Sequence, residues 1–182
     1  MIRLGVLADT HVPDRARRMS PKVLSMFRNA GLQAILHAGD VSVPTVLEQL
    51  GEIAPVYAVR GNRDIFALGS LPLERIVSWN GVAVALTHGH GPWRNYLVDR
   101  LHFKLHGYYH ERLIPRLLGS FPDVQAIVFG HGHLPLNEYR DGRLLFNPGS
   151  PHLPGENGLD PSVGFLHISG SGAISGEIVY LG

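Results

Sequence analysis

The first third of the chain alternates apolar runs of strand length with segments that carry helix signals. Ser20-Pro21 is typical of a helix start, because serine is a favoured N-cap and proline fits the first helical turn; this helix is predicted to reach Asn29. Val43-Pro44 begins a second predicted helix, which runs through Leu50. The apolar runs before, between and after these two helices predict buried strands at residues 2–8, 34–38 and 55–59. This alternation predicts parallel strands with the helices packed outside them.

Hairpins dominate the rest of the chain. Asn80-Gly81 joins two predicted strands, 75–79 and 82–87, and is the strongest short hairpin signal a sequence offers. Further strands are predicted at 125–129, 136–139, 144–147, 163–169 and 173–180, with a proline- and glycine-rich loop at 152–161. Parallel strands followed by hairpins predict a mixed α/β fold: two mixed sheets packed face to face with helices outside, a four-layer α/β/β/α sandwich. No repeat or linker divides the chain, so residues 1–182 are expected to form one domain.

Residues 92–118 have a helical pattern, with Leu97, Leu101, Leu105 and Tyr109 spaced four apart. Gly107 and Pro115 are expected to bend or break this helix. The favoured interpretation is an amphipathic helix that covers one sheet and keeps its basic face in water. Because aromatic and basic residues alternate here, a nucleobase-stacking surface is an alternative. A subunit interface of a homo-oligomer is a third.

Composition narrows the class of protein. The chain has 182 residues, a formal net charge of +1 and no cysteine. Disulfides, thiolate metal sites and cysteine nucleophiles are therefore excluded, and the charge balance disfavours a nucleic-acid partner. The first apolar run reaches Asp9 too soon for a signal peptide, and no run is long enough to cross a bilayer. We expect a cytoplasmic protein with no membrane partner.

Polar residues follow the predicted strands in five places. Asp40 ends the run Leu36-His37-Ala38-Gly39, although an unpaired buried charge is costly there. The other clusters are Asp9-Thr10-His11, Gly61-Asn62, Thr87-His88-Gly89-His90 and Gly130-His131-Gly132-His133. Each of the shorter clusters taken alone could be a turn with a surface side chain. Together they supply carboxylates, an amide and imidazoles, which is the ligand set of a two-metal centre.

The ordered set of motifs resembles the calcineurin-like metallophosphoesterase superfamily, over residues 9–150. The run Thr87-His88-Gly89-His90 and the closing Asn147-Pro148-Gly149-Ser150 are similar to its small phosphodiesterase branch, which includes the retromer sorting subunit. The resemblance implies two divalent metal ions, with manganese the first to try; iron, cobalt, nickel and zinc also suit these ligands. It assigns Asp9, His11 and His133 to one metal and Asn62, His88 and His131 to the other, with Asp40 bridging.

The resemblance implies an enzyme, a metal-dependent phosphodiesterase that hydrolyses a small or nucleotide-like phosphorylated substrate through the dinuclear centre and a bridging hydroxide. A phosphomonoesterase or a dinucleoside polyphosphate hydrolase would use the same metals. A binding scaffold on the same fold is the rival from another class, as the retromer subunit is. That subunit has asparagine in place of the bridging aspartate and aspartate in place of the asparagine, so Asp40 and Asn62 disfavour the scaffold.

The motif around Asn62 departs from the superfamily pattern. A histidine usually follows the asparagine, whereas this chain has Gly61-Asn62-Arg63-Asp64. Since arginine does not give up its proton in a protein, Arg63 can bind charge but cannot act as a general acid. We hypothesise that Arg63 holds a phosphate oxygen, and that His90 lies beside the metal ligands or faces the phosphate.

Two further segments lie close in sequence to the motifs or complete them: the arginines after the first motif and the closing Asn-Pro-Gly-Ser run. Arg15, Arg17 and Arg18 belong to a solvated loop in the favoured interpretation, or to a rim that steers phosphate. Asn147-Pro148-Gly149-Ser150 is expected to shape a turn beneath the site.

Overall fold

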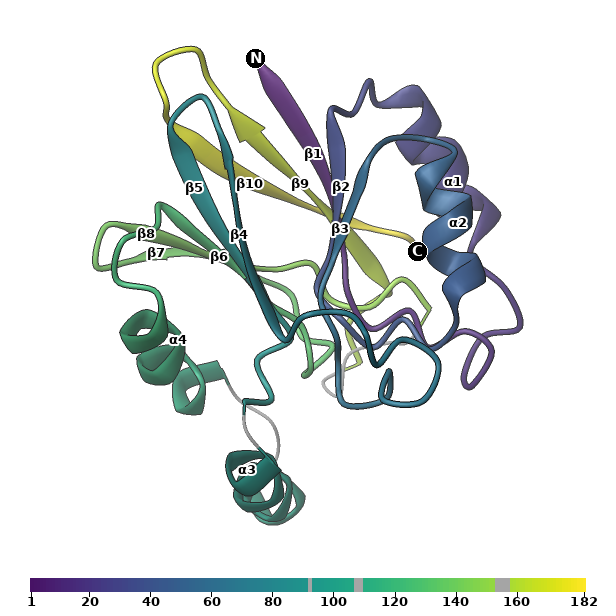
Figure 1. The fold of residues 1–182 in the computed structure, drawn as a ribbon, viewed down its shortest axis with the longest axis vertical. Helices are drawn as coiled ribbons and strands as arrows, with labels where there is room; N and C mark the ends of the chain where they lie inside the picture. Colours follow the sequence, from purple (N-terminus) through teal and green to yellow (C-terminus); the bar gives the residue numbers. More distant parts are fainter. Residues whose placement is uncertain (92, 107–109, 153–157) are drawn as a thin grey trace.

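Two five-stranded sheets form the centre of the computed structural model, which describes residues 1–91, 93–106, 110–152 and 158–182 (Figure 1). In the first sheet β1 (Ile2–Leu7), β2 (Ala34–His37) and β3 (Val56–Ala58) are parallel. β9 (Ser162–Ile168) is antiparallel to β1, and β10 (Ile174–Tyr180) to β9, so the strand order is β10-β9-β1-β2-β3.

The second sheet has the order β4-β5-β6-β8-β7. β4 (Glu74–Trp79) and β5 (Val82–Thr87) form the hairpin predicted around Asn80-Gly81. β6 (Ala126–Val128) and β8 (Arg143–Asn147) continue the sheet in parallel, and β7 (Leu136–Arg140) pairs antiparallel with β8. Both sheets are mixed, as predicted.

Three apolar clusters account for the layers. The faces of the two sheets that meet bury the alternate residues of their strands, including Val6, Leu36, Val84, Val128 and Phe146. α1 (Pro21–Asn29) and α2 (Pro44–Gly51) cover the outer face of the first sheet, and α4 (Ile114–Ser120) covers the second (Figure 1). The predicted four-layer α/β/β/α arrangement is confirmed.

The predicted helix 92–118 is divided into shorter elements, in keeping with the bend or break expected within it, and only the part given to Pro115 needs correction. α3 (Trp93–His106) is followed by the one-turn η1 (His110–Arg112) and by α4. Pro115 lies in the first turn of α4, where a missing N–H removes no helical hydrogen bond, so it helps to begin a helix rather than break one. Pro92, Gly107 and Tyr109 lie outside the described residues.

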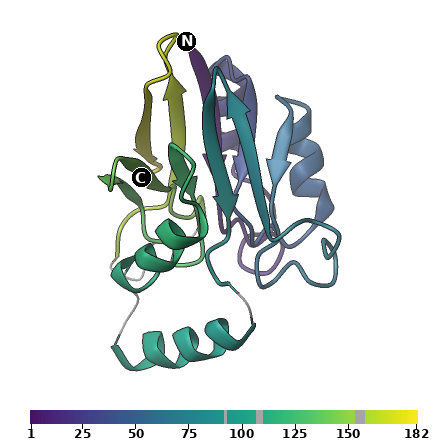
Figure 2. The ribbon, with the colours of Figure 1, turned by 60° about the vertical axis from the view of Figure 1, so that its left-hand side comes forward.

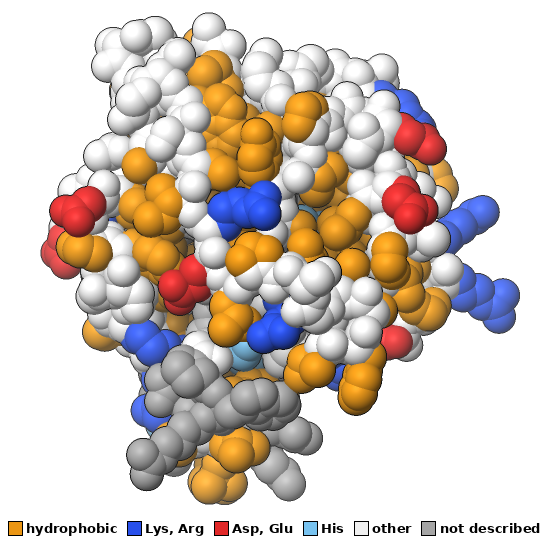
Figure 3. Space-filling view, viewed as in Figure 1, with side chains coloured by type: hydrophobic (Ala, Val, Ile, Leu, Met, Phe, Trp, Pro, Cys, Tyr) orange, Lys and Arg blue, Asp and Glu red, His pale blue; other side chains and the backbone are white. Residues whose placement is uncertain are grey.

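α3 does not cover a sheet, contrary to the favoured interpretation. Leu97, Leu101 and Leu105 are 59%, 61% and 69% exposed. The backbone of the helix stands away from both sheets (Figure 2), and apolar side chains protrude from this end of the molecule (Figure 3). Most of the helical residues that pack on the second sheet come from α4 and the turn before it, including Leu113, Ile114 and Leu117, and α3 adds only the partly buried Phe103 among the described residues. Within the described residues, no helix is both long and apolar enough to cross a membrane.

Candidate metal centre

All seven predicted metal ligands lie in what we call the strand-end region: residues 8–11, 38–42, 60–64, 88–90 and 130–133, which follow β1, β2, β3, β5 and β6. Because these strands are parallel within each sheet, their carboxyl ends lie on one side of the sandwich. The strand-end clusters of the sequence therefore come together in space.

The first group consists of Asp9, His11 and His133. The Nε2 atoms of His11 and His133 are 3.1 Å apart. Oδ1 of Asp9 lies 3.7 Å from Nε2 of His11 and 3.4 Å from Nε2 of His133. Three ligand atoms thus converge on one point, and they form a group that could hold a metal ion.

The second group consists of Asn62, His88 and His131, next to Asp40. Nε2 of His88 is 3.1 Å from Oδ1 of Asn62, and its ring centroid is 5.1 Å from that of His131. Asp40 lies between the two groups, since its Oδ2 is 3.8 Å from Nε2 of His11 and its Oδ1 is 3.6 Å from Nε2 of His88. That is the position a bridging carboxylate needs.

The backbone of the strand-end region adopts a conformation that L-residues rarely take. Asp9, His11, Asp40, His131 and His133 have φ angles of 54°, 48°, 54°, 78° and 53°. Left-handed backbone outside glycine costs on the order of 1–3 kcal/mol per residue and is concentrated at functional sites. Five of the seven predicted ligands share it, so the fold directs their side chains inward at a cost in stability.

Close backbone contacts hold the loops against one another. Gly39 has a φ of 87°, and a Cβ on it would lie 2.8 Å from both the Gly61 nitrogen and Nδ1 of His88. The backbone N–H of Asp9 donates to the Gly39 carbonyl at 3.0 Å, and that of His11 to the Asp40 carbonyl at 3.1 Å. Only glycine leaves room for this approach.

Two carboxylates bind backbone N–H groups across the loops. The buried Asp64 accepts hydrogen bonds from the N–H groups of Ser42 and Gly61, each at 2.8 Å. Oδ2 of Asp9 accepts one from the N–H of His131 at 2.9 Å. The sequence alone assigns no role to Asp64. The only indication of one is that this acidic residue follows the predicted ligand Asn62 two positions later.

The turn after β8 lies beneath the ligand loops, as predicted. Nδ2 of Asn147 donates to the Gly130 carbonyl at 3.0 Å, and the Ser150 hydroxyl donates to the Asp9 carbonyl at 2.8 Å. Both contacts reach backbone beside a predicted ligand, so this turn supports the site without entering it.

The charges of the two groups are coupled. Burial raises the pKa of Asp9, but His133, His88 and His11 outweigh it and the net pKa is lowered. Burial also raises the pKa of Asp40, which His88 opposes. The pKa of His88 is raised, because Asp40 and Asp9 outweigh the effect of its burial.

Two of the predicted ligand histidines are held neutral. Burial lowers the pKa of His11 to about 3 despite the neighbouring Asp9. Burial and His88 lower the pKa of His131 to about 3. Neutral imidazole is the form that binds metal, so the protein keeps these ligands in the required state.

The residues present fit a divalent cation. Oδ1 of Asp9 is buried and has no hydrogen-bond partner among the described residues. An unpaired buried carboxylate oxygen is costly, and a cation at the point where His11 and His133 converge would satisfy it. The donor set is nitrogen and oxygen without thiolate, which suits manganese, iron, cobalt, nickel or zinc.

Arg63 and His90 lie at the margin of the two groups. The backbone N–H of Arg63 donates to Oδ1 of Asp40 at 2.9 Å, while its side chain is 41% exposed and its Nη1 lies 3.6 Å from Oδ2 of Asp14. The His90 ring is 5.3 Å from that of His88 and 6.3 Å from that of His131, on the side of the second group. Arg15, Arg17 and Arg18 are exposed, as expected for a solvated loop.

The chain belongs to the calcineurin-like phosphoesterase superfamily, whose domain profile matches residues 2–171. It is 34% identical over 179 residues to a probable metallophosphoesterase of Methanothermobacter thermautotrophicus, an alignment that covers 98% of this chain and 92% of the relative. It is 30% identical to the phosphodiesterase YfcE of Escherichia coli, over 91% of this chain and 88% of that protein.

Solved structures of Vps29 share the fold. Vps29 of Chaetomium thermophilum matches with a TM-score of 0.74 at 18% identity, covering 98% of this chain and 97% of that one. Vps29 of Entamoeba histolytica in complex with zinc matches with a TM-score of 0.68 at 21% identity, over the full length of both chains. The predicted family is confirmed by the domain profile and the curated relatives, and the Vps29 structures show the same fold.

Proposed function

We propose that this protein is a metal-dependent phosphodiesterase that binds two divalent ions in the strand-end region. The observation that carries the proposal is the position of Asp40 between two groups of nitrogen and oxygen ligands. Similarity to the E. coli phosphodiesterase over most of both chains supports the reaction class. A single domain over residues 1–182 remains part of the proposal.

Asp9, His11 and His133 would hold one ion, and Asn62, His88 and His131 the other, with Asp40 shared. Two bound ions would supply a nucleophile at neutral pH and stabilise the charge of the phosphoryl group. The protein's own part is orientation, since the left-handed loops and the Asp64 hydrogen bonds fix the ligands before an ion arrives. Manganese is the ion to test first.

Arg63 takes the position of the usual histidine, and we propose that it binds a phosphate oxygen. Its backbone is fixed on Asp40 while its guanidinium is partly exposed near Asp14, so the side chain can swing toward a substrate. Because arginine supplies no proton, the enzyme should prefer esters whose leaving group needs no acid. Arg63→His should therefore raise turnover of alkyl esters relative to aryl esters; an unchanged ratio would contradict this role.

The test is hydrolysis of bis-p-nitrophenyl phosphate and p-nitrophenyl phosphate by metal-stripped protein, before and after manganese is added. Diester turnover that requires both metal and Asp40, with Asp40→Asn as the control, establishes the phosphodiesterase. Faster monoester turnover would favour a phosphomonoesterase instead. No turnover with manganese, iron, cobalt, nickel or zinc, despite measured metal binding, would favour a binding scaffold.

A further inference from the structure

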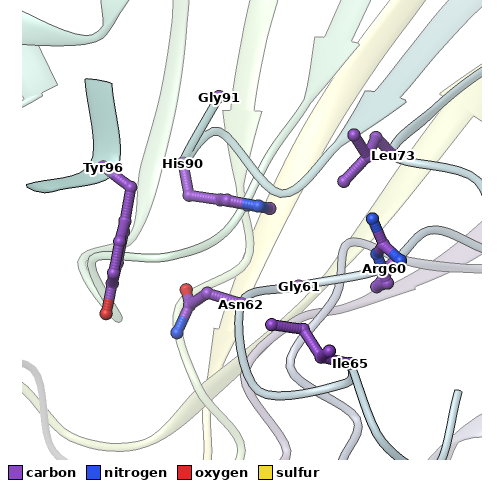
Figure 4. Close-up of a pocket in the computed structure, with 8 residues that line it drawn as sticks. All are labelled: Arg60, Gly61, Asn62, Ile65, Leu73, His90, Gly91 and Tyr96. Carbon is purple, nitrogen blue, oxygen red and sulfur yellow. The ribbon is translucent and has the colours of Figure 1, made fainter. Parts of the chain in front are cut away.

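A pocket opens directly beside the second ligand group. It is lined by Arg60, Gly61, Asn62, Ile65, Leu73, His90, Gly91 and Tyr96, and its empty volume is about 380 Å³, part of it open to solvent (Figure 4). Asn62 belongs both to this pocket and to the predicted metal ligands. A phosphoryl group bound at the metals would therefore have one of its ester groups at the mouth of the pocket.

The walls of the pocket are apolar or aromatic. Ile65 and Leu73 are 38% and 44% exposed, so both present aliphatic carbon to the pocket. The rings of His90 and Tyr96 are nearly perpendicular, at 88° with centroids 6.3 Å apart. Figure 4 shows Tyr96 and His90 on the side opposite Leu73 and Arg60, with Asn62 below His90. A flat ring between these walls would contact a ring on one side and aliphatic carbon on the other.

The polar groups of the pocket are few. The guanidinium of Arg60 already donates to the Gly69 carbonyl at 3.0 Å, which fixes it against the loop that carries Ile65. Asn62 is turned toward His88. A sugar or glycerol group inside the pocket would need more hydrogen-bond partners than this lining offers, so the lining suits a planar ring, and the sugar of a nucleoside ester would have to lie outside it.

A second cavity continues the first. It is lined by Leu73, Glu74, Thr87, His90 and Gly91 and shares Leu73, His90 and Gly91 with the pocket. By the measure in which a closed cavity of about 150 Å³ binds benzene, the first pocket holds about 60 Å³ and the second about 260 Å³, so a six-membered ring has room in the second cavity. The two cavities together have room for a larger ring-bearing group, with the Glu74 carboxylate at the far end.

We propose that this pocket is a subsite for the aromatic ester group of a phosphodiester substrate, and that Leu73 and Ile65 set its specificity. This inference rests on the proposed function, because the phosphoryl group must lie at the metals. The shared chemistry is a planar ring in the group that is esterified to the phosphate: the ring is bonded directly to the ester oxygen in an aryl ester and is attached through the sugar in a nucleoside ester. An aryl alcohol and a nucleoside both provide it.

The experiment compares diesters with the same p-nitrophenolate leaving group. p-Nitrophenyl phenyl phosphate, p-nitrophenyl methyl phosphate and the p-nitrophenyl ester of thymidine 5′-phosphate are hydrolysed by the manganese-loaded enzyme. Leu73→Ala and Ile65→Ala should lower the phenyl-to-methyl ratio of kcat/KM at least fivefold, mainly through KM for the phenyl ester. Ile76→Ala is the matched control, because Ile76 is 58% exposed on β4 and does not line the pocket; its ratio should equal that of the wild type.

The thymidine ester separates the two sources of the ring. A preference for it over the phenyl ester that Glu74→Gln abolishes assigns the pocket to a nucleotide. A preference for the phenyl ester that Leu73→Ala abolishes assigns it to an aryl ester. If Leu73→Ala and Ile65→Ala leave every ratio unchanged while turnover still depends on metal, the subsite is wrong and the phosphodiesterase stands.

A binding measurement separates failure of the subsite from failure of the enzyme. Diphenyl phosphate and dimethyl phosphate are titrated into metal-loaded protein by calorimetry. Diphenyl phosphate should bind at least tenfold more tightly, and Leu73→Ala should remove the difference. If this holds without hydrolysis of any diester, the pocket is supported and the proposed activity is wrong; equal binding of the two probes overturns the pocket.

Discussion

The strand-end region and helix α3 lie near each other in this protein but are held in opposite ways. Asp9, His11 and Asp40 are no more than 3% exposed, and backbone hydrogen bonds connect their loops. α3 leaves most of the surface of Leu97 and Leu101 in solvent, and Asp99 joins it to Arg112 and Arg116 through ion pairs of 2.7 and 2.9 Å. The predicted metal ligands, whose positions must be accurate for the chemistry, therefore lie in the buried and hydrogen-bonded part of the fold. α3 supplies Tyr96, a wall of the pocket, where less accuracy is needed.

The largest expected effect follows from changing a ligand of the rigid region. Asp9→Asn should lower metal-dependent kcat/KM by about 10³-fold, because it removes a charge that would hold an ion and leaves an amide in its place. Steady-state kinetics on bis-p-nitrophenyl phosphate measure the loss, and metal content after dialysis shows whether an ion has been lost. Asp123→Asn, at an exposed position, is the control and should change neither. Full activity in Asp9→Asn would exclude Asp9 as a ligand.

The next largest effect is expected from removing Asp64, whose hydrogen bonds connect two loops of the strand-end region. Asp64→Ala leaves the buried N–H groups of Ser42 and Gly61 without their acceptor, at about 1–3 kcal/mol each. We expect the free energy of unfolding to fall by roughly 3 kcal/mol and kcat/KM by about 10–100-fold. Asp64→Asn keeps one acceptor oxygen and should give intermediate values in both measurements. If Asp64→Ala unfolds like the wild type, the two hydrogen bonds do not hold these loops.

The sequence predicted more of the strand-end region than of helix α3. The spacing of polar residues after apolar strands located Asp9, Asp40 and His131, since a strand end fixes where the next side chain must lie. The same reasoning could not assign Asp64 or the pocket, because the groups that Asp64 binds and the walls of Leu73 and Tyr96 come from separate segments. These meet only after both sheets are assembled.

For α3 the pattern predicted the helix but not what the helix faces. Leucines at intervals of four residues are typical of a face that packs on a sheet. In this chain Leu113 and Leu117 pack on the second sheet instead. Leu117 belongs to α4, a separate helix with Pro115 in its first turn. Periodicity records which residues share a face and contains no information on whether that face finds a partner.

Acid should destabilise the metal-free protein through the buried histidines of the strand-end region and through His37 in β2. Burial lowers the pKa of His37 to about 4 and those of His11, His90 and His131 to about 3, all from 6.5. Below pH 6.5 the unfolded chain therefore takes up protons that the folded chain does not, and stability falls as the pH decreases toward about 4. His88 acts in the opposite sense, because its pKa is raised and its contribution is lost only as the pH rises.

Denaturant unfolding in the presence of a chelator measures this effect. We expect the free energy of unfolding to fall by roughly 2 kcal/mol or more between pH 7 and pH 5. Added manganese should stabilise the protein at pH 7, and the gain should be smaller at pH 5, because His88, whose pKa is raised, must lose a proton to bind the ion, whereas His11 and His131 are already neutral at both pH values. Stability that is constant or rises toward pH 5 would show that these histidines are not held neutral.

The smallest effect is expected where the sequence pattern is most regular. Leu101→Ala on α3 should change the free energy of unfolding by no more than about 0.5 kcal/mol, because the side chain is already 61% exposed. Leu117→Ala on α4 is the matched substitution and should cost about 2–5 kcal/mol, because Leu117 is only 3% exposed and packs on the second sheet. Urea unfolding of both variants decides the matter. A loss of 2 kcal/mol or more in Leu101→Ala would contradict this expectation. It would mean that the leucine face of α3, which is exposed in the single chain, is buried against another surface in solution.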